Sequence, residues 1–355
     1  MVELYHVLGS CRNAFLKLPE LAVEAPRLKT AVNDSGELSF TVWAGHPEFG
    51  LFCSMESEIV LEENGAETWR GRVTEQELDE LEGKLTVKVK GVLDYLYDTV
   101  QPQGNYTGTA QEALQSILDI HNNKPIPDCK KLALGVVTVT AEIQDFSVRA
   151  GTKTWKAVGD LIRTYGGYLI PRKAQQGYVL DWLGELTELC TQSIRLGENL
   201  LSLRRYIETD KLATVLYGYG KTTEDVPLGL ETVCDGLGYV YDGEAVAVFG
   251  WIEDTYTDSK CEDAAALKTA TEAELQKRLS ETRAIKLSAV DLADIRADAE
   301  RIRVGVLVPV EGISEEATFP CLELDRYLLE PEKTKIALSA SLRTLSGMLG
   351  GIYDN

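Results

Sequence analysis

Hydrophobic and polar positions alternate with a period of two over much of the first hundred residues. This alternation predicts strands with one face on a core. It runs through four segments, residues 38–42, 59–61, 69–73 and 85–89. Asn64-Gly65 stands between two of them, and this dipeptide is typical of a tight hairpin turn. The pattern predicts a first small β-barrel over residues 1–105.

A helical pattern follows. Thr109-Ala-Gln-Glu112 is a capping box and predicts the start of a helix. A second apolar stripe, over residues 155–165, predicts another helix, and Gly166-Gly167 follows it where a left-handed cap is needed. Two strand patterns within residues 168–182 then predict a hairpin. We therefore expect an α+β module over residues 106–200.

Strand patterns return from Leu201 onward, in residues 215–219, 239–241, 246–249, 302–308 and 336–338. One long helix interrupts them. The capping box Ser259-Lys-Cys-Glu262 predicts its start, and Ser288–Asp291 predicts a further short helix. The long helix carries an apolar stripe at Ala264, Leu267, Thr271, Leu275 and Leu279.

These patterns predict a second β-barrel over residues 201–340, with a helical insertion at about 259–283, and a flexible C-terminal tail over 341–355. The predicted fold class is α+β and mainly β. Two small β-barrel domains, related by pseudo-symmetry, flank the α+β module.

Composition narrows the classes of function. The chain has 355 residues, 44% of them apolar, which is an ordinary globular balance. Its 56 acidic and 36 basic residues give a net charge of −20, which disfavours nucleic-acid binding. No apolar run reaches the length of a membrane span, and the N-terminus does not resemble a secretory signal. We therefore expect a chain made in the cytoplasm, without membrane insertion.

Cysteines and histidines give little support for catalysis. The seven cysteines are scattered without a CxxC pair, which predicts buried thiols in a reducing compartment and neither a disulfide framework nor a zinc site. Only His6, His46 and His121 could serve a nucleophile, and no GxSxG or HExxH motif occurs. We predict structural or surface roles for all three, with a cationic His121 complementing a helix dipole.

Acidic groups are the other candidates. Asp291, Asp294 and Asp298 would share one helix face, as metal ligands can, but charge runs are usually solvated, so we expect a surface. We expect the same of a second acidic group, formed by Glu75, Glu77, Asp79, Glu80 and Glu82. No pair of carboxylates stands out for glycoside hydrolysis. The sequence therefore predicts no catalytic residue, no metal site and no cofactor.

One further segment carries glycines and aromatic rings. Gly218-Tyr-Gly-Lys221 lacks the GxxxxGK[ST] of a phosphate loop, so we interpret it as a strand end and turn. Tyr217 and Tyr219 would be able to stack on a sugar or on a partner chain. Trp251 is a further candidate for a sugar-binding adhesin, and the sequence does not choose between these uses.

The order of short motifs resembles a known family, the tail hub proteins of siphophages, prophages and contractile particles, which are also called prophage endopeptidase tail or tail-associated lysin proteins. The resemblance covers about residues 30 to 340. It rests on the joint order of ten segments: Leu38-Ser-Phe-Thr-Val42, Trp69-Arg-Gly-Arg-Val73, Val92-Leu-Asp-Tyr-Leu-Tyr97, Tyr106-Thr-Gly-Thr109, Ile117-Leu-Asp-Ile-His-Asn122, Leu134-Gly-Val-Val137, Gly166-Gly-Tyr168, Gly197-Glu-Asn-Leu200, Leu212-Ala-Thr-Val-Leu-Tyr-Gly-Tyr-Gly-Lys221 and Val290-Asp-Leu292.

The resemblance implies a homotrimer at the tip of a tail tube, with two barrels per subunit forming a ring that adapts sixfold to threefold symmetry. It implies a distal tail or tail tube protein, a tape-measure protein and a tail fibre or receptor-binding protein as partners, and a place in the virion tail tip. We expect no enzyme activity, because the chain ends without the C-terminal enzyme of other members. The alternatives are a tail-associated peptidase or cell-wall hydrolase, and the hub of a bacteriocin or secretion particle.

The net charge then suggests a hypothesis. An acidic wall repels phosphate, so a lumen lined by these acids would let DNA pass without binding it.

Overall fold

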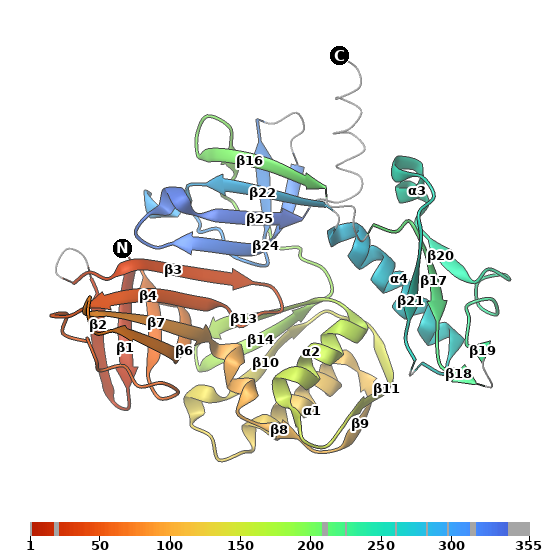
Figure 1. The fold of residues 1–355 in the computed structure, drawn as a ribbon, viewed down its shortest axis with the longest axis horizontal. Coiled ribbons are helices and arrows are strands. Elements are labelled where there is room, and N and C mark those ends of the chain that lie inside the picture. Colours follow the sequence, from red (N-terminus) through yellow and green to blue (C-terminus); the bar gives the residue numbers. More distant parts are fainter. Residues whose placement is uncertain are drawn as a thin grey trace. The chain divides into compact units, whose positions relative to one another are not determined.

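A computed structural model describes residues 2–17, 21–207, 212–223, 226–259, 261–281, 283–296, 298–312 and 317–339. The predicted tail over 341–355 lies outside these residues. The chain forms two compact units, which are described separately (Figure 1). Unit 1 comprises Met1–Gln192, Ser288–Leu307 and Cys321–Ile336. Unit 2 comprises Ser193–Leu287, Val308–Pro320 and Ala337–Asn355.

The first part of unit 1 is an antiparallel sheet with the strand order β24-β3-β4-β7-β6-β5-β1-β2. Its strands are β1 (Val2–Leu8), β2 (Cys11–Leu16), β3 (Glu24–Ala31), β4 (Glu37–Trp43), β5 (Glu58–Glu63), β6 (Ala66–Asp79), β7 (Lys84–Gly91) and β24 (Ala317–Tyr327). The four predicted strand segments all lie in this sheet.

The alternation of apolar and polar residues along these strands explains which side chains face the core. Phe40 of β4 and Val87 of β7 are paired neighbours that point to the core, and both are buried. Asn64 and Gly65 both have positive φ, 52° and 81°, as the tight turn between β5 and β6 requires. Within the described residues β2 ends the strand order, whereas β24 is followed by β25 (Lys335–Ser339), so no pairing closes these strands into a barrel. The pseudo-symmetric pair of barrels stays a prediction.

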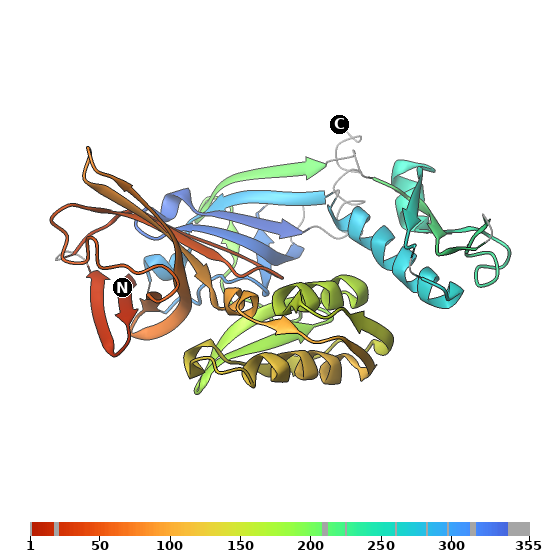
Figure 2. The same ribbon diagram turned by 60° about the horizontal axis from the view of Figure 1, so that its bottom comes forward.

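A central α+β module follows in unit 1. Its elements are η1 (Val92–Tyr97), β8 (Val100–Gln101), β9 (Gly104–Thr109), α1 (Ala110–Asn122), η2 (Asp128–Lys130), β10 (Leu132–Val137), β11 (Glu142–Val148), β12 (Thr152–Lys153), α2 (Thr154–Tyr165), β13 (Tyr168–Ala174) and β14 (Gly177–Leu183). Helices α1 and α2 lie against the sheet β10-β14-β13 (Figure 2). Residues of both helices and of this sheet form one core, which includes Trp182.

The capping box at the start of α1 is the one that the sequence predicts. The Thr109 hydroxyl accepts the Glu112 N–H at 3.2 Å, and the Glu112 carboxylate accepts the Thr109 N–H at 2.9 Å. Helix α2 ends at Tyr165, and the following Gly166 has a φ of 74°, which favours glycine, but its ψ of −168° is not that of the predicted left-handed cap. The hairpin predicted within residues 168–182 is the β13–β14 pair.

The later elements are β15 (Ile194–Arg195), β16 (Leu200–Ile207), β17 (Val215–Tyr219), β18 (Thr222–Thr223), β19 (Val226–Pro227), β20 (Tyr239–Tyr241), α3 (Gly243–Phe249), β21 (Glu253–Thr257), α4 (Ala264–Glu281), β22 (Arg283–Ala289), η3 (Leu292–Asp294), β23 (Leu307–Glu311), η4 (Pro331–Lys333) and β25 (Lys335–Ser339). In unit 2, β15 pairs with β23, and a separate sheet has the order β20-β17-β21. Helix α4 packs on this separate sheet through Leu267, Leu275 and Leu279.

Three sequence predictions in this region are wrong in detail. Residues 246–249, predicted as a strand, belong to α3, because Asp242 accepts the Ala245 N–H at 2.8 Å and caps a helix. Helix α4 begins at Ala264, and Asp263, not Ser259, accepts a free backbone N–H of its first turn, that of Ala266 at 2.8 Å. The alternation at 302–308 becomes a strand only from Leu307, because Gly305 has a φ of 89° and turns the chain.

Candidate functional site

His6 lies in a buried arrangement that the sequence search missed. Its Nδ1 is 2.5 Å from Glu48 Oε2, and its Nε2 is 2.7 Å from Ser57 Oγ. The three groups follow the order acid, base and nucleophile of a hydrolytic triad. Ser57 is fully buried, however, and its Oγ also accepts the Cys53 N–H at 2.8 Å. A substrate carbonyl has no path to this oxygen. The hydrogen bonds among His6, Glu48 and Ser57 therefore serve to pair polar groups that the fold has buried.

The other two histidines are held by backbone groups. His46 Nε2 donates to the Phe15 carbonyl at 2.9 Å, which leaves Nδ1 to accept the Glu48 N–H. His121 is completely buried, with Nε2 3.1 Å from the Lys130 carbonyl. Burial lowers the pKa of His121, so the ring is neutral near pH 7. The predicted cationic role of His121 at the helix end is therefore wrong.

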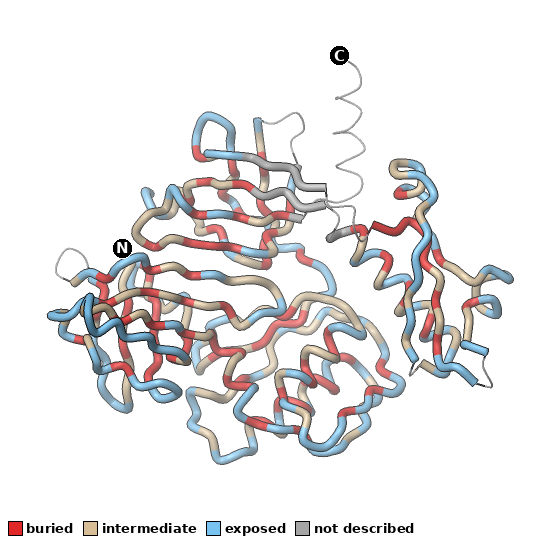
Figure 3. The backbone as a smooth tube through the Cα atoms, viewed as in Figure 1, coloured by how far each residue is buried: buried red, intermediate tan, exposed pale blue. Residues whose placement is uncertain are grey.

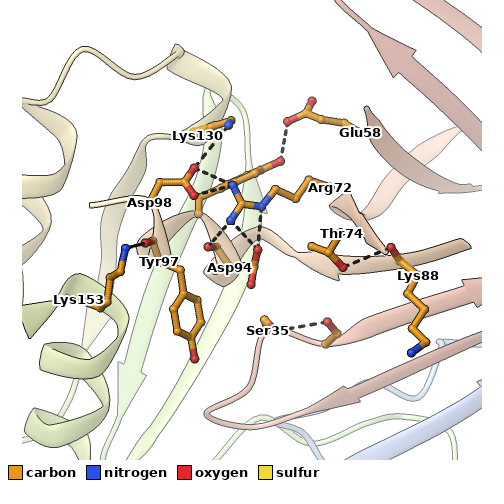
Figure 4. A network of polar contacts seen from close by, with 12 residues as sticks. Ser35, Glu58, Arg72, Thr74, Lys88, Asp94, Tyr97, Asp98, Lys130 and Lys153 are labelled. Atoms are coloured by element: carbon orange, nitrogen blue, oxygen red, sulfur yellow. Dashed lines mark hydrogen bonds and ion pairs between the residues drawn. The ribbon is translucent and has the colours of Figure 1, made fainter. Parts of the chain in front are cut away.

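One polar network in unit 1 centres on Arg72 of β6 (Figure 4). Its Nε lies 2.7 Å from Asp94 Oδ2, and its Nη1 lies 2.7 Å from Asp98. Tyr95, on the same η1 segment, donates to Glu58 at 2.5 Å. The Arg72 side chain is buried, which works against its charge, but the two carboxylates raise its pKa. The network therefore fixes the junction between the first sheet and the central module.

A second buried network joins sequence-distant parts of unit 1. Glu63 of β5 lies 2.7 Å from Arg326 of β24 and 3.1 Å from Arg301. Burial works against the charged form of Glu63, but the two guanidinium groups outweigh it and lower its pKa. Asp291 and Asp294 both pair with Arg301, at 3.2 and 2.8 Å. Each acid is thus neutralised by an arginine.

The three aspartates considered as metal ligands do not converge. Asp298 pairs with Arg296 at the surface, and η3 is too short to place it on one face with Asp291 and Asp294. Within the described ranges no group of three or more His, Cys, Asp or Glu residues could hold a metal ion. Asp291 is buried, so its predicted surface position is wrong, and burial raises its pKa.

The second acidic group lies at the solvated end of the β6–β7 hairpin, as predicted: Glu75, Glu77, Asp79, Glu80 and Glu82 are all exposed. Two of these acids pair with lysines of β7, Glu75 with Lys88 and Glu82 with Lys84. Beyond Arg72, β6 has no register partner on β5 and pairs only with β7. Leu81 at the tip is 99% exposed. The hairpin end is thus an exposed acidic projection that also carries two exposed leucines, Leu78 and Leu81.

The sequence predicts that the cysteine thiols are buried, and only some of them are. Cys190 and Cys321 are buried, and burial raises the pKa of Cys321 to about 12. Cys11, Cys53 and Cys129 are exposed, which corrects the prediction for these three. All seven thiols are free in the structure.

Gly218 and Lys221 lie at a strand end, as predicted. A Cβ at Gly218 would come within 2.5 Å of Thr271 Oγ1 on α4, so glycine permits close helix packing there. Lys221 pairs with Glu262. These contacts leave no cradle for a phosphate.

The opposite face of the same sheet carries aromatic rings. Tyr217, Tyr239, Tyr241 and Trp251 contact one another, with centroid distances from 5.2 to 6.4 Å. Glu253 Oε1 accepts the Trp251 Nε1–H at 2.8 Å and the Tyr217 hydroxyl at 3.2 Å. We call these five residues the aromatic face. Within the described residues, no helix is long and apolar enough to cross a membrane.

The comparisons with known proteins agree with this fold. Residues 190–349 match the family model described as prophage endopeptidase tail. No curated protein matches the chain. Three solved structures share its fold along nearly the whole chain, at sequence identities of 13 to 15%.

The first is the tail protein from Neisseria meningitidis MC58, with a TM-score of 0.65 and 15% identity, covering 96% of this chain and 97% of that one. The second is the 43 kDa tail protein of prophage MuSo2 from Shewanella oneidensis, with a TM-score of 0.68 and 13% identity, covering 96% and 98%. The third is the prophage tail protein gp18 from Listeria monocytogenes EGD-e, with a TM-score of 0.61 and 14% identity, covering 98% and 97%. The family match and the shared fold confirm that this chain resembles the phage tail hub and prophage endopeptidase tail family.

Proposed function

We propose that the chain is a structural hub protein of a phage or prophage tail tip, which trimerises to close the tail tube. The observation that carries the proposal is a fold shared with three prophage tail proteins along nearly the full length of both chains. The proposed role is assembly without catalysis. The virion tail tip is its proposed location, after synthesis in the host cytoplasm.

The buried polar groups support a role without catalysis. Catalysis needs a reactive group that a substrate can reach. In the described part of unit 1, Arg72 is held by two aspartates, and the Ser57 hydroxyl is buried beneath the first sheet. These groups stabilise the fold and present no reactive atom at a surface.

Strand edges support assembly into a ring. Strand β2 lies at the end of the strand order in the first sheet, with β1 as its ladder partner. An edge strand carries backbone groups that another chain can satisfy. We propose that pairing at such edges joins three subunits, and that two similar sheet domains per subunit adapt a sixfold tube to threefold symmetry. The proposed partners are a distal tail or tube protein, a tape-measure protein and a receptor-binding protein.

The distribution of charge supports an acidic lumen. Residues 106–200 carry ten acidic and ten basic residues, so the central module has no net charge. The net charge of −20 therefore resides in residues 1–105 and 201–355, which are the two regions proposed to form the ring. We propose that part of this charge lines the channel and keeps DNA from binding. A neutral or basic channel wall would refute this part of the proposal.

Electron microscopy of the purified chain, alone and with a distal tail protein, tests the hub assignment. We expect ring-shaped particles with threefold symmetry and a central hole. Particles with twofold symmetry, or without a hole when the partner is present, would overturn it.

One observation favours a second candidate, a tail-associated peptidase or cell-wall hydrolase. The matching family model carries the word endopeptidase in its description. Ser57, although buried, stands in triad order with His6 and Glu48, so it is the residue to test. Zymography on peptidoglycan separates the candidates. We expect no lysis by the chain, whereas lysis that disappears in Ser57→Ala would establish the hydrolase.

A further inference from the structure

The sheet β20-β17-β21 has two faces of different character. Leu216 and Val240 belong to the core that α4 covers. Because side chains alternate along a strand, Tyr217 of β17 and the paired Tyr239 of β20 point to the opposite face. That is the aromatic face defined above. Figure 3 colours the chain by burial, and both buried and less buried positions occur along these strands.

The aromatic face remains accessible although its rings pack together. Tyr241 is 56% exposed and Trp251 is 51% exposed. Their ring centroids are 6.2 Å apart, with planes tilted by 35°, and Tyr239 meets Trp251 edge-on at 5.6 Å. Ring contacts of this kind preorganise a surface, and exposed clusters of Trp and Tyr are typical of binding hot spots.

The module that carries the aromatic face is strongly negative as a whole. Residues 212–281 hold fourteen acidic and five basic residues, a net charge of −9 in 70 residues. Glu253 accepts hydrogen bonds from Trp251 and Tyr217 and is itself exposed. Glu231 adds a second carboxylate at the Tyr217 end, because a Cβ at Gly238 would contact both Glu231 Oε1 and the Tyr217 ring. A partner that binds this face must therefore either tolerate the acidic rim or carry positive charges that pair with its carboxylates.

Elsewhere in this chain, aromatic rings are covered by positively charged side chains. Lys84 lies 4.4 Å above the ring of Trp43, and Arg12 lies 4.2 Å above that of Tyr5. Among the described residues, no Lys or Arg covers any of the four rings of the aromatic face. The face thus combines open π-surfaces with carboxylates and lacks the cation that covers comparable rings in unit 1.

We propose that the aromatic face is a docking site for a segment of a partner protein that presents Lys or Arg side chains. A basic side chain would lie over Trp251 or Tyr241 and pair with Glu253 or Glu231, which satisfies both features of the surface. This proposal goes beyond trimerisation and holds whether or not the hub proposal does. A neutral saccharide would stack on the rings but would leave the carboxylates of the acidic rim without a partner. A second copy of the chain would bring a further net charge of −20 to the acidic rim.

The test is selection of a random twelve-residue peptide library against the full-length chain, followed by titration of the enriched peptides by fluorescence anisotropy. We expect peptides with positive net charge, whose affinity falls as NaCl is raised from 0.05 to 0.3 M. The double variant Tyr241→Ala/Trp251→Ala should weaken binding by about tenfold or more. The matched control Trp43→Ala removes an exposed tryptophan of unit 1 and should leave binding unchanged.

A second, milder variant keeps the test valid if the double variant fails to fold. Glu253→Gln keeps an oxygen that can accept from Trp251 and Tyr217 but removes the charge, and we expect binding to weaken by about three- to tenfold. Enrichment of neutral or acidic peptides would overturn the proposal, and so would no enrichment at all. It would also be overturned if both variants bound the enriched peptides as tightly as the unmodified chain does. Binding of a neutral oligosaccharide at the same rings, or self-association lost in the double variant, would overturn it in favour of a sugar or a second copy.

Discussion

The central module and the acidic module of residues 212–281 use aromatic residues in opposite ways. In the central module Trp182 and Tyr178 are buried, and Trp182 donates to the Gly166 carbonyl at 2.9 Å. In the acidic module Tyr241 and Trp251 are exposed and lie beside carboxylates. The first module has no net charge and the second has −9. The difference separates residues that hold the fold together from residues that are available to partners.

The largest expected effect comes from the two tryptophans. Trp182→Ala should lower the free energy of unfolding by about 3–5 kcal/mol, because it leaves a cavity in the core of the central module. Trp251→Ala should lower it by less than about 1 kcal/mol, because half of that side chain is in water already. Guanidinium denaturation followed by circular dichroism measures both. Similar losses in the two variants would break the comparison.

A second pair of variants compares buried and exposed charges. Arg72→Ala should cost about 3–5 kcal/mol, because Asp94 and Asp98 lose their partner in a buried network. Lys221→Ala breaks an exposed pair with Glu262 in the acidic module and should cost about 1 kcal/mol or less. The same denaturation experiment applies. A small loss for Arg72→Ala would mean that the network does not hold the junction together.

Helix caps should give an intermediate effect. Thr109→Ala removes the hydroxyl that accepts the Glu112 N–H at the start of α1 and should cost about 1 kcal/mol. Thr109→Ser retains the hydroxyl and serves as its control. If the alanine and serine variants unfold at the same denaturant concentration, the capping box makes no contribution.

The smallest effect is a dependence on pH. Burial lowers the pKa of His121 in the folded chain, so the unfolded chain binds the proton more readily. Stability should therefore fall as the pH is lowered from 7.5 to 5.5, through the ordinary histidine range. His121→Asn should reduce this slope, as measured by denaturation at several pH values. An unchanged slope would show that His121 makes no contribution to it.

The sequence predicts local structure in this chain better than it predicts contacts between distant segments. Alternation locates β4 and β7, and the capping box locates α1, because these signals depend on neighbouring residues. The pairing of β24 with β3 joins residues almost 300 positions apart, and no local pattern reports it. Residues 246–249 have strand-like composition, but a cap at Asp242 makes them helical.

The candidate sites show the same limit. The triad order of His6, Glu48 and Ser57 comes from a fold that brings β1 next to a distant loop, so no motif could reveal it. The polar partners of Asp291 likewise come from distant residues, Gln192 and Arg301. By contrast, Tyr217 was recognisable as a surface residue, because strand alternation with a buried Leu216 places it on the other face.

The central claim is that three copies of this chain form a closed hub, and a cryo-EM reconstruction without imposed symmetry tests it most directly. The hub proposal predicts threefold symmetry around a central channel, with six similar sheet domains in the ring. Twofold symmetry, or an assembly without a channel in the presence of a tail partner, would contradict it.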